Sequence, residues 1–127
     1  MGAPTRIPLI TLALLTFFIA HPGSAAADEA VLDEDAIRTV LAGNTVAGVK
    51  DGQPWRQSFT ATGQTTYYAG SSAPSDGFWR IQDNAYCSKW PPFGGWACYE
   101  MTGDLSASPQ TVTFIGSGGD KWPAHVQ

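Results

Sequence analysis

The chain has 127 residues, a formal net charge of −4 and 43% hydrophobic residues. An acidic chain argues against nucleic acid and anionic lipid surfaces as partners, because both reward clustered Lys and Arg. With two cysteines and two histidines in the whole sequence, neither a His/Cys metal site nor a bound cofactor is expected.

The first 27 residues have the three parts of a secretory signal peptide. Arg6 supplies the positive charge of the first part, and the uncharged apolar run Leu9–Ala20 forms the second. The small residues Ser24–Ala27 match the site that a signal peptidase cleaves. The apolar run is shorter than the roughly 20 helical residues that cross a bilayer. We therefore predict a signal peptide over 1–27 and a single exported domain over 28–127. The domain is expected to be periplasmic or secreted, with no stable membrane insertion after cleavage.

The two cysteines of the chain, Cys87 and Cys98, both lie in the predicted mature domain. An isolated pair in an exported chain is typical of a disulfide. Closing a loop of this size stabilises a fold by about 3 kcal/mol in the chain-entropy model. We therefore predict a Cys87–Cys98 disulfide.

A short helix is predicted over Glu34–Leu41. Asp33 is a typical N-cap residue, and two acids follow it in the first turn, where the helix dipole favours negative charge. The apolar residues between Val31 and Leu41 form a partial stripe, and Gly43 is a typical residue after the last turn.

After Gly43 the pattern becomes that of an all-β domain. Short apolar stretches are interrupted by Gly, Pro, Asn and Asp every eight to twelve residues or so. The predicted strands are Thr45–Val49, Trp55–Thr60, Thr65–Ala69, Phe78–Gln82, Ala85–Lys89, Trp96–Met101 and Thr111–Ile115. Turns are predicted at Asp51–Pro54, Thr62–Gln64, Asp83-Asn84, Pro91–Gly95 and Thr102–Asp104. This predicts a mainly β fold, a small antiparallel barrel or sandwich of about seven strands with one short N-terminal helix.

The stretch from Gly77 to Met101 allows the strand register to be predicted. A two-residue turn at Asp83-Asn84 places Arg80 opposite Cys87, and the disulfide then places Cys87 opposite Cys98. The same register pairs Tyr86 with Tyr99 and Lys89 with Trp96. Because side chains alternate along a strand, the residues divide into two faces. The core face is predicted to hold Trp79, Ile81, Tyr86, Trp90, Tyr99 and Met101. The outer face is predicted to hold Phe78, Arg80, Gln82, Cys87, Lys89, Cys98 and Glu100, with the disulfide among them.

Four segments together resemble a family of small exported bacterial proteins that is catalogued as a domain of unknown function. The segments are Leu41–Val46, Trp79-Arg80-Ile81, Tyr86–Pro91 and Trp96–Tyr99, and the Cys-x-x-Trp…Cys-Tyr hairpin is the most specific of them. The resemblance implies export in a Gram-negative bacterium and a β-rich domain, and it implies no activity. The triplet Gly77-Phe78-Trp79 also looks like the Gly-x-Trp of lipocalin-type barrels, although there it opens the first strand.

Few groups in the predicted mature domain suit catalysis. Its one histidine, His125, lies near the end of the chain, where we expect a solvated tail. Paired carboxylates such as Asp76 and Glu100 are the remaining candidates, although an ion pair between Glu100 and Arg80 across the sheet is the simpler interpretation. The glycine-rich stretch Gly116–Asp120 is predicted to be a turn.

The loop between the two cysteines is the main binding candidate. Lys89, Trp90, Phe93 and Trp96 surround two prolines, and a stiff loop loses less entropy when it docks. The leading hypothesis is a non-catalytic exported domain that binds an envelope protein, peptide or glycan through these side chains. The alternatives are a carboxylate-dependent hydrolase of envelope polymers, an inhibitor of a hydrolase such as lysozyme, and a structural envelope protein with no specific ligand.

Overall fold

The computed structural model describes residues 2–4 and 29–127. Apart from residues 2–4, the predicted signal peptide over 1–27 lies outside the described residues. Within the described ranges, no helix has the length and apolar character needed to span a bilayer.

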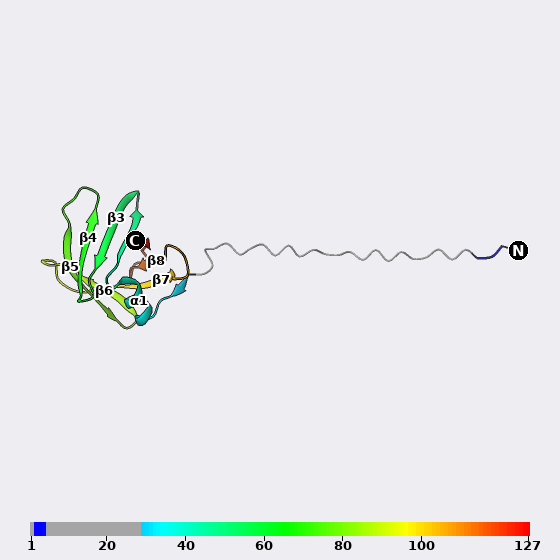
Figure 1. Cartoon of the computed structure of the whole chain (residues 1–127), viewed down its shortest axis with the longest axis horizontal. Coiled ribbons are helices and arrows are strands. Elements are labelled where there is room, and N and C mark those ends of the chain that lie inside the picture. Colours follow the sequence, from blue (N-terminus) through cyan, green and yellow to red (C-terminus); the bar gives the residue numbers. More distant parts are fainter. Residues whose placement is uncertain (1, 5–28) are drawn as a thin grey trace.

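The described part contains one helix and nine strands. In chain order they are β1 (Ala30–Val31), α1 (Glu34–Leu41), β2 (Thr45–Lys50), β3 (Gln53–Phe59), β4 (Gln64–Ala69), β5 (Ser75–Gln82), β6 (Ala85–Lys89), β7 (Ala97–Asp104), β8 (Thr111–Ile115) and β9 (Lys121–Val126). Figure 1 shows the strands curving around a common interior, with α1 at one end of them.

The strands close into a barrel. Neighbouring strands from β2 to β7 pair in chain order, β9 pairs with both β2 and β8, and β8 pairs with β7. The result is a closed antiparallel barrel of eight strands, and β1 is an extra strand on β7. Closure leaves no long unpaired edge, which is how a small sheet protects its backbone groups. The predicted mainly β class is confirmed, and the structure decides for a barrel rather than a sandwich.

Two strands exceed the predicted set of seven. In strand β9, His125 lies opposite Ala47 of β2 and opposite Thr111 of β8. The residue is exposed, as expected, but it belongs to an ordered strand, so the predicted tail is wrong. The glycines before β9 and Pro123 inside it conceal the alternating pattern of this segment. Strand β1 precedes the helix, since Asp33 caps α1 and the residues before it are extended. Val31 therefore belongs to β1 and is exposed, not part of the helical stripe.

Two of the hairpin turns consist of residues that can adopt a positive φ. Asp51-Gly52 and Asp83-Asn84 have positive φ at both positions, as a two-residue turn that matches the twist of the strands requires. The predicted turn at Thr102–Asp104 is wrong, because β7 continues through Asp104. There Gly103 pairs with both Ala30 and Val112, and a side chain at Gly103 would meet the Thr111 carbonyl.

The helix closes one end of the barrel. As predicted, Asp33 caps it, with its carboxylate accepting a hydrogen bond from the Ala36 amide at 2.9 Å. The Glu34 amide donates to the Asn84 side chain at 2.9 Å, which ties the helix to the β5–β6 turn. The apolar face of α1, with Ile37 and Leu41 fully buried, packs into the main core. That core comprises Leu32, Ile37, Val40, Leu41, Val46, Trp55, Phe59, Trp79, Tyr86, Met101, Val112, Phe114 and Ala124.

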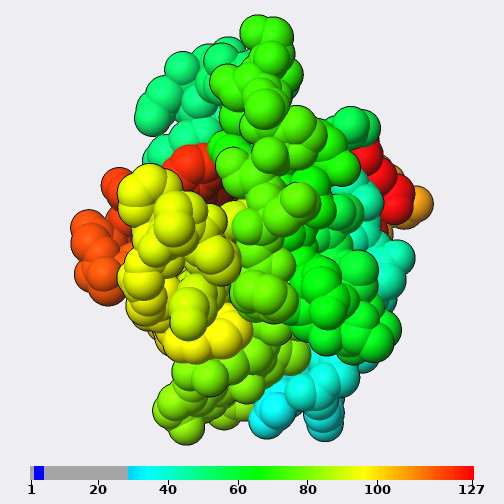
Figure 2. All heavy atoms as spheres, turned by 90° about the vertical axis from the view of Figure 1, so that its left-hand side faces the viewer, coloured from blue at the N-terminus to red at the C-terminus, as the bar shows by residue number. Residues whose placement is uncertain are grey.

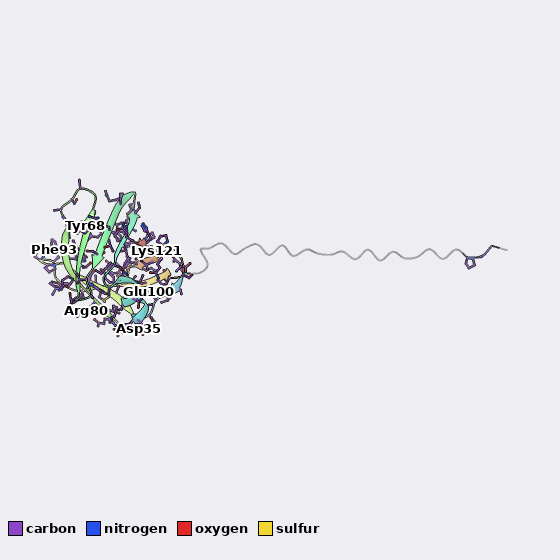
Figure 3. All side chains as sticks on the ribbon, viewed as in Figure 1. Asp35, Tyr68, Arg80, Phe93, Glu100 and Lys121 are labelled. Carbon is purple, nitrogen blue, oxygen red and sulfur yellow. A yellow bond between two sulfur atoms is a disulfide. The ribbon has the colours of Figure 1, made fainter. Side chains whose placement is uncertain are left out.

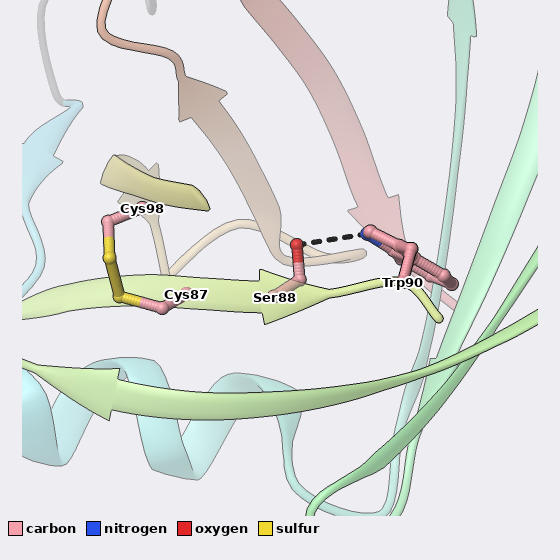
Figure 4. The surroundings of a disulfide bond; sticks show 4 residues. All are labelled: Cys87, Ser88, Trp90 and Cys98. Carbon is pink, nitrogen blue, oxygen red and sulfur yellow. Dashed lines mark hydrogen bonds between the residues drawn. A yellow bond between two sulfur atoms is a disulfide. The ribbon is translucent and has the colours of Figure 1, made fainter. Parts of the chain in front are cut away.

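The predicted register around the disulfide is confirmed where the strands pair. Arg80 lies opposite Cys87, and Cys87 lies opposite Cys98, to which it is bonded. Figure 4 shows the bridge joining the two neighbouring strands. It lies on the outer face of the barrel, because Cys87 alternates with the cavity-lining Tyr86 and Ser88 and because Cys98 is exposed. The β6–β7 pairing ends at Ser88 and Ala97, so the predicted pairing of Lys89 with Trp96 is wrong.

Candidate functional site

The end of the barrel opposite α1 is bordered by four loops. Because the strands are antiparallel and α1 lies beside the β5–β6 turn, the β2–β3 turn and the loops over 70–74, 90–96 and 116–120 all fall at the other end. Figure 2 shows a hollow on this side between the yellow and green segments, with part of the red C-terminal strand inside it. The barrel is therefore closed by a helix at one end and open at the other.

A cavity of about 250 Å³ occupies the open half of the barrel. Its walls come from seven strands and from the residue that follows β6. The lining residues are Trp55, Gln57, Tyr67, Ser75, Tyr86, Ser88, Trp90, Tyr99, Phe114 and Trp122. Seven of these ten side chains are aromatic, so the cavity presents ring faces and ring edges to whatever occupies it.

The aromatic walls hold one another in place. The Trp55 ring stacks on Tyr67 with ring centroids 6.0 Å apart and meets the edge of Trp122 at 5.9 Å. Tyr67 in turn meets Trp90 edge to face at 6.3 Å. Such aromatic pairs stabilise beyond their buried area and fix the orientation of each ring. These mutual contacts hold the rings around a central space that they leave unfilled.

A glycine makes room for the largest of these rings. Gly48 lies opposite Trp55 in the β2–β3 pair. A side chain at Gly48 would meet both the Pro123 carbonyl oxygen and the Trp55 indole. Among the described residues, the Trp55 Nε1 is also the one fully buried side-chain polar atom without a hydrogen-bond partner. The indole therefore lies tightly against the wall of the barrel.

The few polar groups of the cavity form two small networks. The Gln57 Nε2 donates to the Thr65 hydroxyl and to the Tyr86 hydroxyl, both at 2.8 Å. The Trp90 Nε1 donates to the Ser88 hydroxyl at 3.2 Å, which turns the indole inward (Figure 4). These contacts connect the base of the cavity to its rim.

The cavity is electrically neutral. None of its lining residues is Asp, Glu, Lys, Arg or His. Burial raises the pKa of Tyr86 to about 12, and the hydrogen bonds from Ser88 and Gln57 offset only part of that rise. Burial also raises the pKa of Tyr67. Both phenols are therefore protonated at neutral pH, and the cavity disfavours a charged group, which would lose its hydration there.

The four binding residues predicted from the sequence do not share one surface. Trp90 lines the cavity, whereas Phe93 at the loop tip is 79% exposed. Figure 3 places Phe93 at the outer edge of the molecule. Trp96 lies outside the barrel under the Arg80 guanidinium, 4.0 Å from the ring centroid, and Lys89 pairs with Phe78 in β5. The loop thus divides into an inward residue, a free tip and an outer-face residue.

The carboxylate candidates lie away from the cavity. Asp76 is exposed and accepts a hydrogen bond from the Thr66 hydroxyl at 2.9 Å, and Glu100 is exposed on β7. The predicted ion pair of Glu100 with Arg80 is wrong, because Arg80 stacks on Trp96 instead. The sole ion pair in the described part joins Arg38 and Glu34, and no cluster of three or more potential metal ligands occurs in that part.

A second, wider depression of about 860 Å³ involves the outer faces of β2, β3 and β9. It contains His125 and also Arg56, whose guanidinium lies 4.3 Å from the centre of the Tyr68 ring. Glu29 at its border accepts hydrogen bonds from Thr102 and Thr113. Arg56 and Glu29 are thus engaged with neighbouring side chains.

The cavity itself was not predicted from the sequence. The number of aromatic residues, Trp55, Tyr67, Trp90 and Trp122 among them, exceeds what a small core can hold, but composition alone does not bring them together. The available signal was the alternation of Trp55, Gln57 and Phe59 in one strand. A glutamine at an inward position between two aromatic residues is the pattern of a polar group inside a cavity.

The fold and the cavity define this chain as a small closed β-barrel with an aromatic internal site. No protein-family model, curated protein or solved structure matches the chain. The resemblance to an exported family of unknown function therefore stays a prediction.

Proposed function

We propose that this chain is a non-catalytic, exported binding domain whose ligand is a small, neutral, ring-containing molecule held in the aromatic cavity. The observation that carries this proposal is the combination of an open barrel end, a volume of about 250 Å³ and seven aromatic lining residues. Binding sites for small molecules are mostly apolar and concave, with a few polar groups that fix orientation.

The exported location is supported by two features. The Cys87–Cys98 disulfide is of the kind that persists in oxidising compartments such as the periplasm or the extracellular space. The signal-like segment over 1–27 points the same way. A larger envelope partner bound through the loop over 90–96 stays a prediction from the sequence.

The size and neutrality of the cavity limit the ligand. Typical pockets for drug-sized molecules have volumes of about 300–1,000 Å³, so this cavity suits one or two rings. A flat neutral ring can stack on the aromatic walls without losing the hydration of a charge. Polyhydroxylated sugars suit the site less well, since Gln57, Ser75 and Ser88 are the only non-aromatic lining residues.

The test is a titration of the mature domain with toluene, followed by calorimetry and by tryptophan fluorescence. Saturable binding is expected. Trp90→Ala removes an inward wall and should weaken toluene binding about tenfold. Trp96→Ala is the matched control, because it removes a tryptophan from the same loop but outside the cavity, and should leave the affinity within a factor of two or so.

Absence of saturable toluene binding would contradict the proposal. Equal losses in the Trp90 and Trp96 variants would instead move the ligand to the outer face of the loop.

A further inference from the structure

We propose that the cavity selects ring ligands that carry a neutral hydrogen-bond donor, an O–H or N–H group, and that the Gln57 Oε1 is the acceptor that recognises this donor. The inference rests on the proposed function, because it defines the ligand class of the same cavity. Its physical basis is the hydrogen bonding of one glutamine.

The orientation of the Gln57 amide is fixed by its neighbours. The Thr65 hydroxyl donates its one proton to the Ser58 carbonyl at 2.8 Å, so towards Gln57 it acts as an acceptor. The amide group that faces Thr65 must therefore be the NH₂ group. That same Nε2 has its second hydrogen directed to the Tyr86 hydroxyl at 2.8 Å. Both amide hydrogens are thereby used within the protein.

The amide oxygen is left over. No side-chain hydrogen bond in the described part of the chain reaches the Gln57 Oε1, although the residue is only 8% exposed and lines the cavity. Among the described residues, the Trp55 Nε1 is the one side-chain polar atom that is both fully buried and without a hydrogen-bond partner. The Gln57 Oε1 has no partner either, so it is not fully buried and can be reached from the cavity. Gln57 thus presents a free acceptor to the interior of the cavity. A bound ring that covers this oxygen without offering a donor leaves it unpaired, which is costly, whereas a donor on the ligand avoids that cost.

The groups beside Gln57 favour a hydroxyl or an N–H over an ion. The Tyr86 hydroxyl accepts from Gln57 and keeps its own proton, so a ligand oxygen placed there can also receive a hydrogen bond. No cation lines the cavity to compensate a carboxylate. Phenols and ring N–H compounds are therefore the ligand class that the cavity fits, and aromatic acids are outside it.

The experiment compares three probes of similar shape with toluene. In the wild-type domain, 4-methylphenol should bind about tenfold more tightly than 4-methylanisole, which has the same oxygen without the proton. Toluene should bind like the anisole. The anion 4-methylbenzoate should show no saturable binding. These comparisons need no variant, so they test the inference even if a substitution in the cavity prevents folding.

Variants then assign the preference to Gln57. Gln57→Leu should reduce the ratio of phenol to anisole affinity to about one. Gln82→Leu, an exposed glutamine on β5, is the matched control and should keep the wild-type ratio.

The outcomes separate the two proposals. If toluene binds but the phenol has no advantage over the anisole, the donor preference is wrong and the aromatic cavity still stands. If the ratio persists in Gln57→Leu, the recognising atom is not Gln57 Oε1. If toluene shows no saturable binding, the proposed function itself fails.

Discussion

The two ends of this barrel use the same inward-pointing strand positions and yet differ in packing. At the helix end, aliphatic side chains from α1 pack with the rings of Phe59 and Trp79 and fill the interior, with Ile37 and Leu41 completely buried. At the opposite end the inward positions carry large rings, including Trp55, Trp122 and Tyr99, and a cavity remains. Branched and flexible side chains adapt to the space left by their neighbours, whereas planar rings that brace one another do not. The difference indicates that the helix end provides stability and the open end provides a site.

The largest expected effect is at the helix end. Leu41→Ala should lower the free energy of unfolding by about 2–5 kcal/mol, because it removes a fully buried side chain from a filled core. Toluene affinity of the folded variant should stay unchanged. Urea denaturation measures the loss, and Val49→Ala on the exposed face of β2 serves as the control, with a change within about 0.5 kcal/mol. A loss below about 1 kcal/mol for Leu41→Ala would show that the helix end is not the stabilising one.

Tyr86 lies between the two ends, and its buried phenol makes the stability of the fold depend on pH. A tyrosine phenol in the unfolded chain has its ordinary pKa of 10.0, and burial raises the pKa of Tyr86 to about 12 in the folded protein. Below pH 10 or so both states are neutral, and between these two pKa values the unfolded chain loses its proton first. The contribution to stability is therefore fully present below about pH 10 and is lost as the pH rises towards 12, by about 3 kcal/mol in total.

Tyr86→Phe removes this titration. The variant should be less stable than wild type by about 1 kcal/mol at about pH 8, since Gln57 loses an acceptor. Between about pH 8 and pH 11.5 its stability should fall less than that of wild type, as followed by urea denaturation. Parallel stability curves for the two proteins would contradict the burial of a neutral phenol at this position.

The smallest effect is expected at the rim of the open end. Phe93→Ala should change the free energy of unfolding by no more than about 0.5 kcal/mol, because the ring is 79% exposed. It should also leave toluene affinity unchanged, in contrast to Trp90→Ala. A marked loss of affinity for this variant would mean that Phe93 folds over the cavity in the bound state, and the inner and outer parts of the loop would then act together.

Much of the framework follows from local sequence signals. The cap at Asp33, the turn at Asp83-Asn84 and the pairing of Cys87 with Cys98 each depend on neighbouring residues or on one covalent constraint, and all three are confirmed. Alternation in the cysteine hairpin also placed Tyr86 and Tyr99 on the inner side correctly.

The site depends on contacts between distant strands, and local signals do not reveal it. The approach of Trp55 to Trp122 requires β9 to lie between β2 and β8, and the glycines before β9 and Pro123 within it hide the alternation that predicts a strand. Without that strand the barrel does not close, and the surplus aromatic residues have no common interior. The sequence predicts Trp90 both on the docking loop and on the core face, whereas in the structure its ring is part of the cavity wall.

The disulfide joins the strands that flank the segment over 90–96, so it fixes the distance between the two points where that segment leaves the barrel. Because the disulfide holds β6 and β7 together, the pairing of these strands does not depend on the conformation of the segment that connects them. Related or engineered chains can therefore change the length and composition of residues 91–95 while the strands keep their register. Residues 91–95 are therefore a position where other loop sequences can be inserted beside the entrance to the cavity.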